Sequence, residues 1–269
     1  MATIDLSQAQ VMGILNITPD SFSDGGRFAV LDDALRQVDM MQREGATLVD
    51  VGGESTRPGA QAVSEQDELD RVLPVVAAIR ERFEIGISVD TSKTEVMRQA
   101  VAAGASMIND VNALRAEGAM SLMAGMNVPV CLMHMQGEPR TMQADPQYSD
   151  VVADVERFLL NQAQILLEAG VAKSQICIDP GFGFGKTLEH NLALFNAIPR
   201  LAANGFAVLV GVSRKSMLGQ ITGREISERM PGSVAAALLA WEKGAKILRV
   251  HDVAETIDAL KLWKAINNQ

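Results

Sequence analysis

The sequence predicts an α/β fold, a (β/α)8 barrel that forms one domain over residues 1–269. Eight short apolar runs recur along the chain, and helix-length stretches separate most of them; this alternation is typical of a parallel sheet with helical crossovers. The 269 residues are close to the roughly 250 of one such barrel. The runs stop at polar residues, and barrel active sites form at strand carboxyl ends. They end at Asn16, Glu54, Asp90, Asp110, His134, Asp179, Lys215 and Asp252.

The first half of the chain gives four strands with capping signals between them. Strands are expected at 10–16, 47–52, 86–90 and 106–109, and helices at 32–44, from 64, from 92 and at 117–126. Gly45 suits the left-handed position that follows a helix. Ser64 with Asp67, and Ser92 with Glu95, have the spacing of a capping box, so each serine is expected to begin a helix.

The second half repeats the pattern with longer loops. Strands are expected at 129–134, 175–179, 207–212 and 245–250, and helices at 148–169, 188–199, from 233 and at 253–266. The segment from Lys215 to Ser233 is polar and gives no element, and Ser233 is expected to open an apolar helix. The long loops follow strands one, two, five, six and seven, as expected if they build the catalytic face of the barrel.

Charge and composition exclude several classes of protein. The net charge of −9 argues against a nucleic-acid binder, which needs a basic surface. A small anion needs only a few local cations and stays compatible. The chain has no apolar run of about 18 residues, so we expect no membrane span, and residues 1–10 do not resemble a signal peptide. Cys131 and Cys177 lie in strand-like runs and are expected to be reduced core thiols of a cytoplasmic protein.

Carboxylates end several of the apolar runs. Asp90 and Asp179 each follow a strand, where a carboxylate can accept two N–H donors from the edge of a flat ring. The sequence is equally compatible with a structural role for either, as a cap on the next helix. For Asp110, which follows Asn109, the structural role is favoured.

Cationic residues gather at the last two strand ends. Lys215 lies in SRKS, and Arg249 and His251 lie in RVHD. Barrels commonly hold phosphate at this place, and an arginine can grip phosphate with its planar fork or stack on a ring. Surface ion pairing would explain any one of them, but less readily all three.

The segment PGFGFGKT resembles a phosphate loop but has neither the Walker nor the Rossmann spacing of glycines. We therefore expect the glycines to let the backbone turn tightly beside a ligand, with Phe182 or Phe184 packing on it. The histidines at 134, 190 and 251 have no zinc-site spacing, although Mg2+, which uses few protein ligands, remains compatible. Met133, next to His134, is a candidate pocket residue, while His134 itself receives no role.

Eight segments of the chain together closely resemble the bacterial dihydropteroate synthase family. They are MGILNITPDSFSDGG (12–26), VDVGGESTRPGA (49–60), SVDT (88–91), IND (108–110), LMHMQG (132–137), DPGFGFGK (179–186), SRKS (213–216) and RVHD (249–252). The first two and DPGFGFGK are highly specific, whereas SVDT or IND alone would be weak. The resemblance covers nearly the whole chain in order.

The resemblance implies a transferase of folate biosynthesis that joins 6-hydroxymethyl-7,8-dihydropterin diphosphate to 4-aminobenzoate. It also implies Mg2+, a homodimer and susceptibility to sulfonamides. The residues implied to hold the pterin and its diphosphate are Asp90, Asn109, Asp179, Lys215, Arg249 and His251, with Asn16 on both the diphosphate and the metal. Those implied for the aminobenzoate are Phe22, Thr56, Arg57, Pro58, Phe184, Ser213 and Lys215. Catalysis would rest on Arg57, Asp90, Lys215 and Arg249.

Three other functions stay open at this point. A methyltransferase that binds a pterin or folate on a similar barrel would share Asp90, Asn109 and Asp179. A Schiff-base aldolase would use Lys215 as its nucleophile. A pterin-binding protein without catalysis would not need the full set of cationic residues.

Overall fold

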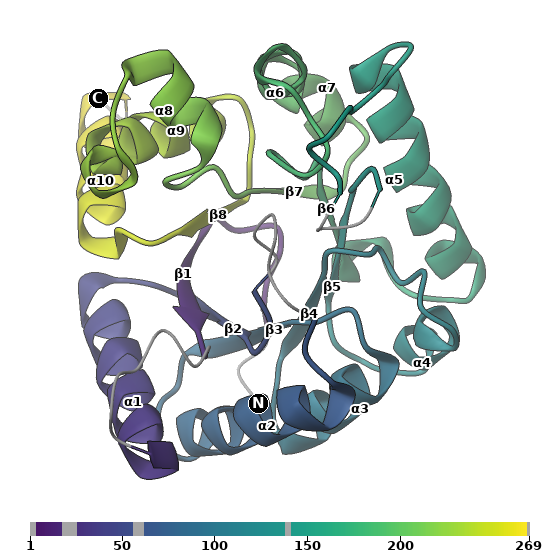
Figure 1. Cartoon of the computed structure of the whole chain (residues 1–269), viewed down its shortest axis with the longest axis vertical. Helices are drawn as coiled ribbons and strands as arrows, with labels where there is room; N and C mark the ends of the chain where they lie inside the picture. Colours follow the sequence, from purple (N-terminus) through teal and green to yellow (C-terminus); the bar gives the residue numbers. More distant parts are fainter. Residues whose placement is uncertain (1–3, 18–25, 56–61, 138–140, 268–269) are drawn as a thin grey trace.

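The computed structural model describes residues 4–17, 26–55, 62–137 and 141–267, and it confirms the predicted (β/α)8 barrel. Eight parallel strands close on themselves in chain order, and helices surround them (Figure 1). The strands are β1 Gln10–Asn16, β2 Leu48–Gly52, β3 Gly86–Asp90, β4 Met107–Asp110, β5 Val130–Met133, β6 Ile176–Asp179, β7 Ala207–Val210 and β8 Ile247–Val250. Their carboxyl ends meet at one mouth, which is where the candidate residues were expected.

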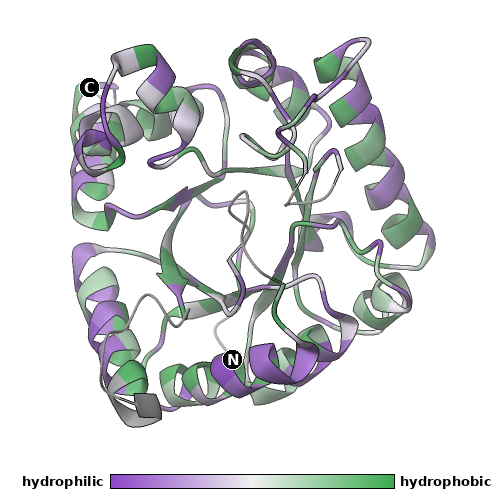
Figure 2. Cartoon of the chain, viewed as in Figure 1, coloured by the Kyte–Doolittle hydropathy of each residue, from purple (hydrophilic) through white to green (hydrophobic). Residues whose placement is uncertain are grey.

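The helices turn their apolar faces toward the strands (Figure 2). They are α1 Gly26–Glu44, α2 Glu65–Arg82, α3 Thr94–Ala103, α4 Ala119–Ala124, α5 Val151–Glu168, α6 Leu188–Asn196, α7 Ile198–Ala203, α8 Ser216–Thr222, α9 Met230–Glu242 and α10 Val253–Asn267, with 3-10 turns at Lys173–Gln175 and Ile226–Glu228. Among the described residues, no helix is long and apolar enough to cross a membrane.

Two apolar cores lie on the two sides of the strands. The larger core fills the space between the sheet and the helices. A smaller one fills the barrel at the amino ends of the strands, and its members include Ile4, Met12, Leu48, Met107, Cys131, Cys177 and Ile247. Both cysteines are free thiols in this inner core, as predicted. Because side chains alternate across a strand, the residues two positions further along also point inward, toward the mouth.

Some element boundaries differ from the sequence prediction. Ser64 caps α2 as expected, since its hydroxyl accepts from the Asp67 amide at 3.1 Å, but α3 has Lys93 at its N-cap instead of Ser92. The predicted helix 188–199 breaks in two at Ala197, and the second part, α7, has a proline as its second residue. Helix α1 starts at Gly26, earlier than expected.

The segment after Lys215 is where the prediction was wrong. It contains the two-turn helix α8 and a 3-10 turn, and α9 begins at Met230, so that Ser233 lies within the helix. The Ser233 hydroxyl donates to the Arg229 carbonyl at 2.8 Å and accepts from the Arg214 amide at 2.9 Å. Ser233 binds its own helix and a neighbouring turn, so the prediction that it begins the helix is wrong.

Candidate active site

Polar side chains replace the apolar core toward the mouth of the barrel. Strand alternation places them two residues after the inner core, and the layer contains Asp50, Ser88, Asn109, Met133, Asp179 and Arg249. All of these except Arg249 are buried. Since a buried polar group is stable only with partners, the hydrogen bonds of this layer indicate what it is built to do.

Asp50 is the centre of that network, and sequence reasoning missed it. Its carboxylate is fully buried and accepts from Ser88 Oγ at 2.6 Å, Asn109 Nδ2 at 3.1 Å and Arg249 Nε at 2.6 Å. Arg249 also donates through Nη2 to Asp90 Oδ2 at 3.2 Å. A signal was present in the sequence: one carboxylate stands in the middle of the apolar strand LVDVG, and such groups are rarely buried unpaired.

The carboxylates of this layer are held where ionisation is costly. Burial raises the pKa of Asp90 to about 7, the negative Asp50 adds to the rise, and Arg249 opposes it. Burial likewise raises the pKa of Asp179, against the opposing charge of Lys215. A ligand that brings N–H donors or positive charge would therefore stabilise both ionised forms.

The SRKS turn directs Lys215 into the mouth. Arg214 takes a left-handed conformation with φ of 58°, unusual for a residue with a side chain. Its ion pair with Asp252 and the bond from its amide to Ser233 hold it there. Lys215 then donates to the Phe182 carbonyl, and burial lowers its pKa to about 8, an effect that Asp179 opposes.

His251 and Ser213 lie next to this turn. The His251 amide donates to Ser213 Oγ at 3.2 Å, and His251 Nδ1 lies 3.0 Å from the same oxygen. Ser213 is buried and His251 is half-buried, so the bond between them fixes the imidazole at the end of β8.

The glycine-rich segment after β6 separates the two phenylalanines that the sequence left as alternatives. Phe182 is fully buried and packs against Phe195, with ring centroids 5.9 Å apart. Phe184 is half-buried, and its ring centroid lies 4.6 Å from Lys215 Nζ. Only Phe184 therefore faces the candidate site. Met133 is the register partner of Asp179. It belongs to a small cluster of methionines against which Phe184 packs.

With this geometry established, comparison with known proteins identifies the family. A family model described as pterin binding enzyme matches residues 12–251. The dihydropteroate synthase of Haemophilus influenzae is 54% identical over 98% of this chain and 96% of its own length, and that of Escherichia coli is 52% identical over 98% and 93%. The chain belongs to the dihydropteroate synthase family of pterin-binding enzymes.

Solved structures agree with this assignment. The dihydropteroate synthase of Xanthomonas albilineans with 4-aminobenzoic acid superposes with a TM-score of 0.93 at 50% identity, covering 99% of this chain and 96% of that one. The same enzyme with 7,8-dihydropteroate gives a TM-score of 0.90 at 48% identity, again over 99% and 96%. The Yersinia pestis enzyme in a sulfonamide complex gives 0.92 at 50% identity, over 99% and 97%.

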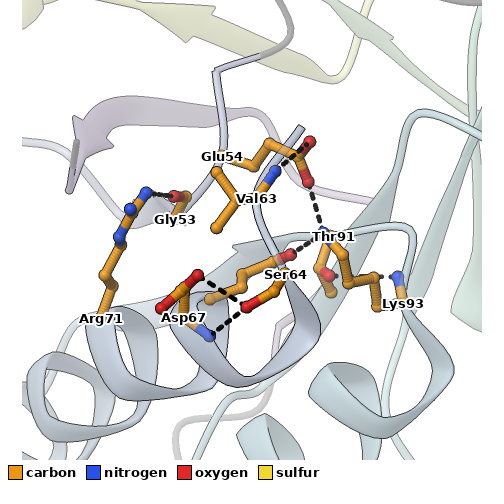
Figure 3. Close-up of polar contacts among 9 residues, drawn as sticks. Gly53, Glu54, Val63, Ser64, Asp67, Arg71, Thr91 and Lys93 are labelled. Atoms are coloured by element: carbon orange, nitrogen blue, oxygen red, sulfur yellow. Dashed lines mark hydrogen bonds and ion pairs between the residues drawn. The ribbon is translucent and has the colours of Figure 1, made fainter. Parts of the chain in front are cut away.

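Four predicted residues, Phe22, Thr56, Arg57 and Pro58, lie outside the described part of the chain. The described residues do show how the ends of the segment after β2 are held (Figure 3). Glu54 accepts from the Val63 amide at 3.2 Å and pairs with Lys93, which also pairs with the buried Glu68. Arg71 donates to the Gly53 carbonyl at 2.9 Å. These contacts join the two ends of the segment to each other and to the start of α3.

Asp110 has a structural role, as the sequence favoured, but it does not cap the next helix, whose N-cap is Gly118. Its carboxylate accepts from the amides of Asn112 at 2.7 Å and Leu114 at 2.6 Å. These bonds hold a turn in which Ala113 and Leu114 have φ values of 51° and 58°. Asp110 thus stabilises the turn after β4 and does not line the site.

The predicted metal ligand, Asn16, ends β1 at the mouth. Gly52 lies between Asn16 and Asp90, since a β-carbon added to it would meet Asn16 Oδ1 at 3.6 Å and the Asp90 β-carbon at 3.8 Å. Among the described residues no group of three His, Cys, Asp or Glu side chains could hold a metal by itself. An amide oxygen at the mouth fits a hard cation such as Mg2+, which uses few protein ligands.

Proposed function

We propose that this chain joins 6-hydroxymethyl-7,8-dihydropterin diphosphate to 4-aminobenzoate and releases diphosphate and 7,8-dihydropteroate. The observation that carries the proposal is the convergence of Asp90, Asn109 and Asp179 with Arg249 and Lys215 at the mouth of the barrel. The Xanthomonas albilineans relative that was solved with 7,8-dihydropteroate supports it.

The ring pocket is the buried part of this layer. Asp179 takes the paired N–H donors of the aminopyrimidinone edge, because one carboxylate can accept two such bonds at once. Asn109 on β4 and Asp90 on β3, which are register partners, complete the pocket. Arg249, held at its edge by Asp50 and Asp90, keeps a planar guanidinium face for stacking on the ring.

The leaving diphosphate lies toward β8. Arg249 and His251 stabilise the charge that develops on it, and Asn16 would hold Mg2+, which neutralises diphosphate oxygens when bound. We propose a dissociative reaction, in which the methylene–oxygen bond breaks first and the ring nitrogens spread the positive charge. The neutral aromatic amine then attacks, and the acidic anilinium so formed releases its proton to the departed diphosphate or to water, so the site needs no strong general base. A secondary kinetic isotope effect near unity at the methylene would contradict this order.

The aminobenzoate lies toward β7, between Lys215, Ser213 and Phe184. The resemblance adds Phe22, Thr56, Arg57 and Pro58 to this side. The Xanthomonas albilineans relative that was solved with 4-aminobenzoic acid supports an aminobenzoate site, and the sulfonamide complex of the Yersinia pestis relative supports sulfonamides as its competitors.

The decisive experiment measures diphosphate release with both substrates and Mg2+ present. We expect release that depends on 4-aminobenzoate and on the metal, and 7,8-dihydropteroate in equal amount. Release without aminobenzoate, or none at all, would contradict the proposal. Borohydride trapping of Lys215 with a carbonyl substrate would instead indicate an aldolase, and methyl transfer to a corrinoid would indicate a methyltransferase.

We further propose a cytoplasmic homodimer. Exposed apolar side chains on α8, α9 and α10 support an interface between two copies, and they are Ile221, Leu239, Leu262 and Ile266. Light scattering of the purified protein tests the dimer, and replacing Leu262 and Ile266 by serine is expected to shift it to monomer. The reduced, buried thiols of Cys131 and Cys177 support the cytoplasmic location.

A further inference from the structure

Lys186, at the end of the glycine-rich segment, is a buried lysine without a carboxylate partner among the described residues. Only 3% of it is exposed. Its Nζ lies 3.0 Å from His134 Nδ1, 3.3 Å from the His134 carbonyl oxygen and 2.9 Å from the Phe184 carbonyl oxygen. Burying an amine is costly, so three directed contacts at this position suggest a purpose beyond packing.

The contacts of Lys186 join two loops of the mouth. His134 follows β5, and Phe184 belongs to the turn after β6. The two backbones already touch, because a β-carbon added to Gly181 would collide with the His134 carbonyl oxygen. Tyr148, in the segment before α5, donates to the Gly185 carbonyl at 2.8 Å. The turn is therefore held to the end of β5 by the Lys186 amine and to the segment before α5 by the Tyr148 hydroxyl.

This turn presents groups to the reacting side of the barrel. The Phe184 ring lies over Lys215 Nζ, and the Phe182 carbonyl accepts from the same nitrogen. We propose that Lys186, acting through His134, is a positioning residue that holds the turn so that Phe184 and Lys215 form the aminobenzoate side of the site. The identity of that substrate rests on the proposed function, but the role of Lys186 in fixing the turn is independent of it.

The proton count of the cluster fits this role. Burial lowers the pKa of Lys186 to about 7, and below that pH its ammonium has three N–H donors. The three atoms around Nζ can then all accept if Nδ1 of His134 is unprotonated. Burial, with the positive charge of Lys186 as the next cause, lowers the pKa of His134 to about 3, which keeps the imidazole neutral. Each polar atom of the cluster then has a partner, and the turn has one arrangement.

The test compares Lys186→Met with Lys173→Met. Lys173 is the control for losing a lysine bond to a backbone carbonyl, because it donates to the Asn204 carbonyl at 2.7 Å, is exposed, and lies at the opposite end of β6. With wild-type enzyme that shows aminobenzoate-dependent diphosphate release, we expect Lys186→Met to raise the KM for 4-aminobenzoate about tenfold. The KM for the pterin diphosphate should stay within about twofold, and kcat should fall less than the aminobenzoate KM rises. Lys173→Met should leave all three unchanged.

Hydrogen exchange provides a readout that does not need activity. Amides of the peptide 180–186 should exchange faster in Lys186→Met than in wild type, and those of Lys173→Met should not. Combining Lys186→Met with His134→Ala should add little to the aminobenzoate KM, because residues that act as a unit are not additive. If wild type lacks aminobenzoate-dependent release, the proposed function fails, and the exchange rates alone decide the role of Lys186.

Two results would overturn the inference. One is an unchanged aminobenzoate KM with unchanged exchange at 180–186 in Lys186→Met. The other is an equal rise in both KM values, which would indicate general damage to the site. If circular dichroism shows that Lys186→Met does not fold, Tyr148→Phe replaces it. That variant removes one bond to the same turn and should raise the aminobenzoate KM selectively, by about threefold; no rise would count against the inference.

Discussion

The two sides of the barrel mouth hold their charges in different ways. On the side built by β2, β3, β4 and β8, Arg249 is paired with Asp50 and Asp90, so buried charges of opposite sign neutralise each other. On the side built by β5, β6 and β7, Lys186 and Lys215 donate to backbone carbonyls. The pKa of Lys186 is lowered by burial to about 7, and that of Lys215 to about 8.

This difference indicates a division of labour. The first side is organised by charge, and each member depends on another, so deleting one leaves a buried charge without a partner. The second side is organised by the backbone turns that carry the carbonyls, and its lysines follow the shape of those turns. Mutations on the first side should therefore damage the chemistry, whereas mutations on the second should alter the fit of one substrate.

Asp179→Asn tests a carboxylate on the second side, and we expect the largest effect there. The amide cannot accept both ring donors, and the negative charge beside Lys215 is lost. Pterin affinity should fall by about 10³-fold or more, beyond detection by calorimetry with a pterin analogue. Unchanged affinity would place the ring edge elsewhere in the mouth.

Asp50→Asn tests the charge network of the first side. The amide can keep a bond to Ser88, but Arg249 loses its closest partner. We expect kcat/KM for the pterin diphosphate to fall roughly 10²- to 10³-fold, as when one preorganised charged contact is removed. The matched control is Asp110→Asn, another buried carboxylate, which should lower the unfolding free energy with little change in kcat/KM. Equal losses of kcat/KM in both variants would contradict the division.

The sequence predicted the features that depend on local patterns in the chain, and it missed those that depend on contacts between distant residues. Strand periodicity and the polar strand ends located the barrel and placed Asp90, Asn109 and Asp179 at its mouth. The sequence prediction missed Asp50 because this residue lies inside a strand and its partners come from three other strands. Helix α8 escaped because it is two turns long and begins without a side-chain cap.

The choice between Phe182 and Phe184 also needed the fold, since both follow a glycine in the same motif. The packing of Phe182 against Phe195 shows that this ring belongs to the core and does not face the site. The role of His134 depends on Lys186, which is 52 residues away in the chain, and no local pattern joins them. Contacts of this kind form when the barrel closes, so neither segment alone predicts them.

The pH dependence of pterin binding tests the protonation state of Asp90 on the first side. Since burial and Asp50 raise the pKa of Asp90 to about 7, the carboxylate is mostly protonated at pH 6 and mostly ionised at pH 8. If the ionised form binds the ring, affinity should rise about tenfold between pH 6 and pH 8. Fluorescence titration with a pterin analogue measures this, and Asp90→Asn should remove most of the rise. A rise that persists in Asp90→Asn would assign it to another group.

The smallest expected effect concerns stability on the second side, at His134. Its folded pKa of about 3 lies below the unfolded value of 6.5, so the unfolded chain takes up a proton first as pH falls, and stability decreases from pH 6.5 downward. Between pH 7 and pH 5.5 this costs about 1 kcal/mol of unfolding free energy, a loss that His134→Gln should lack. Urea unfolding of both proteins at the two pH values measures the difference. Parallel losses would mean that the folded imidazole accepts a proton as readily as the unfolded one, so that His134 could not serve as the neutral acceptor for Lys186.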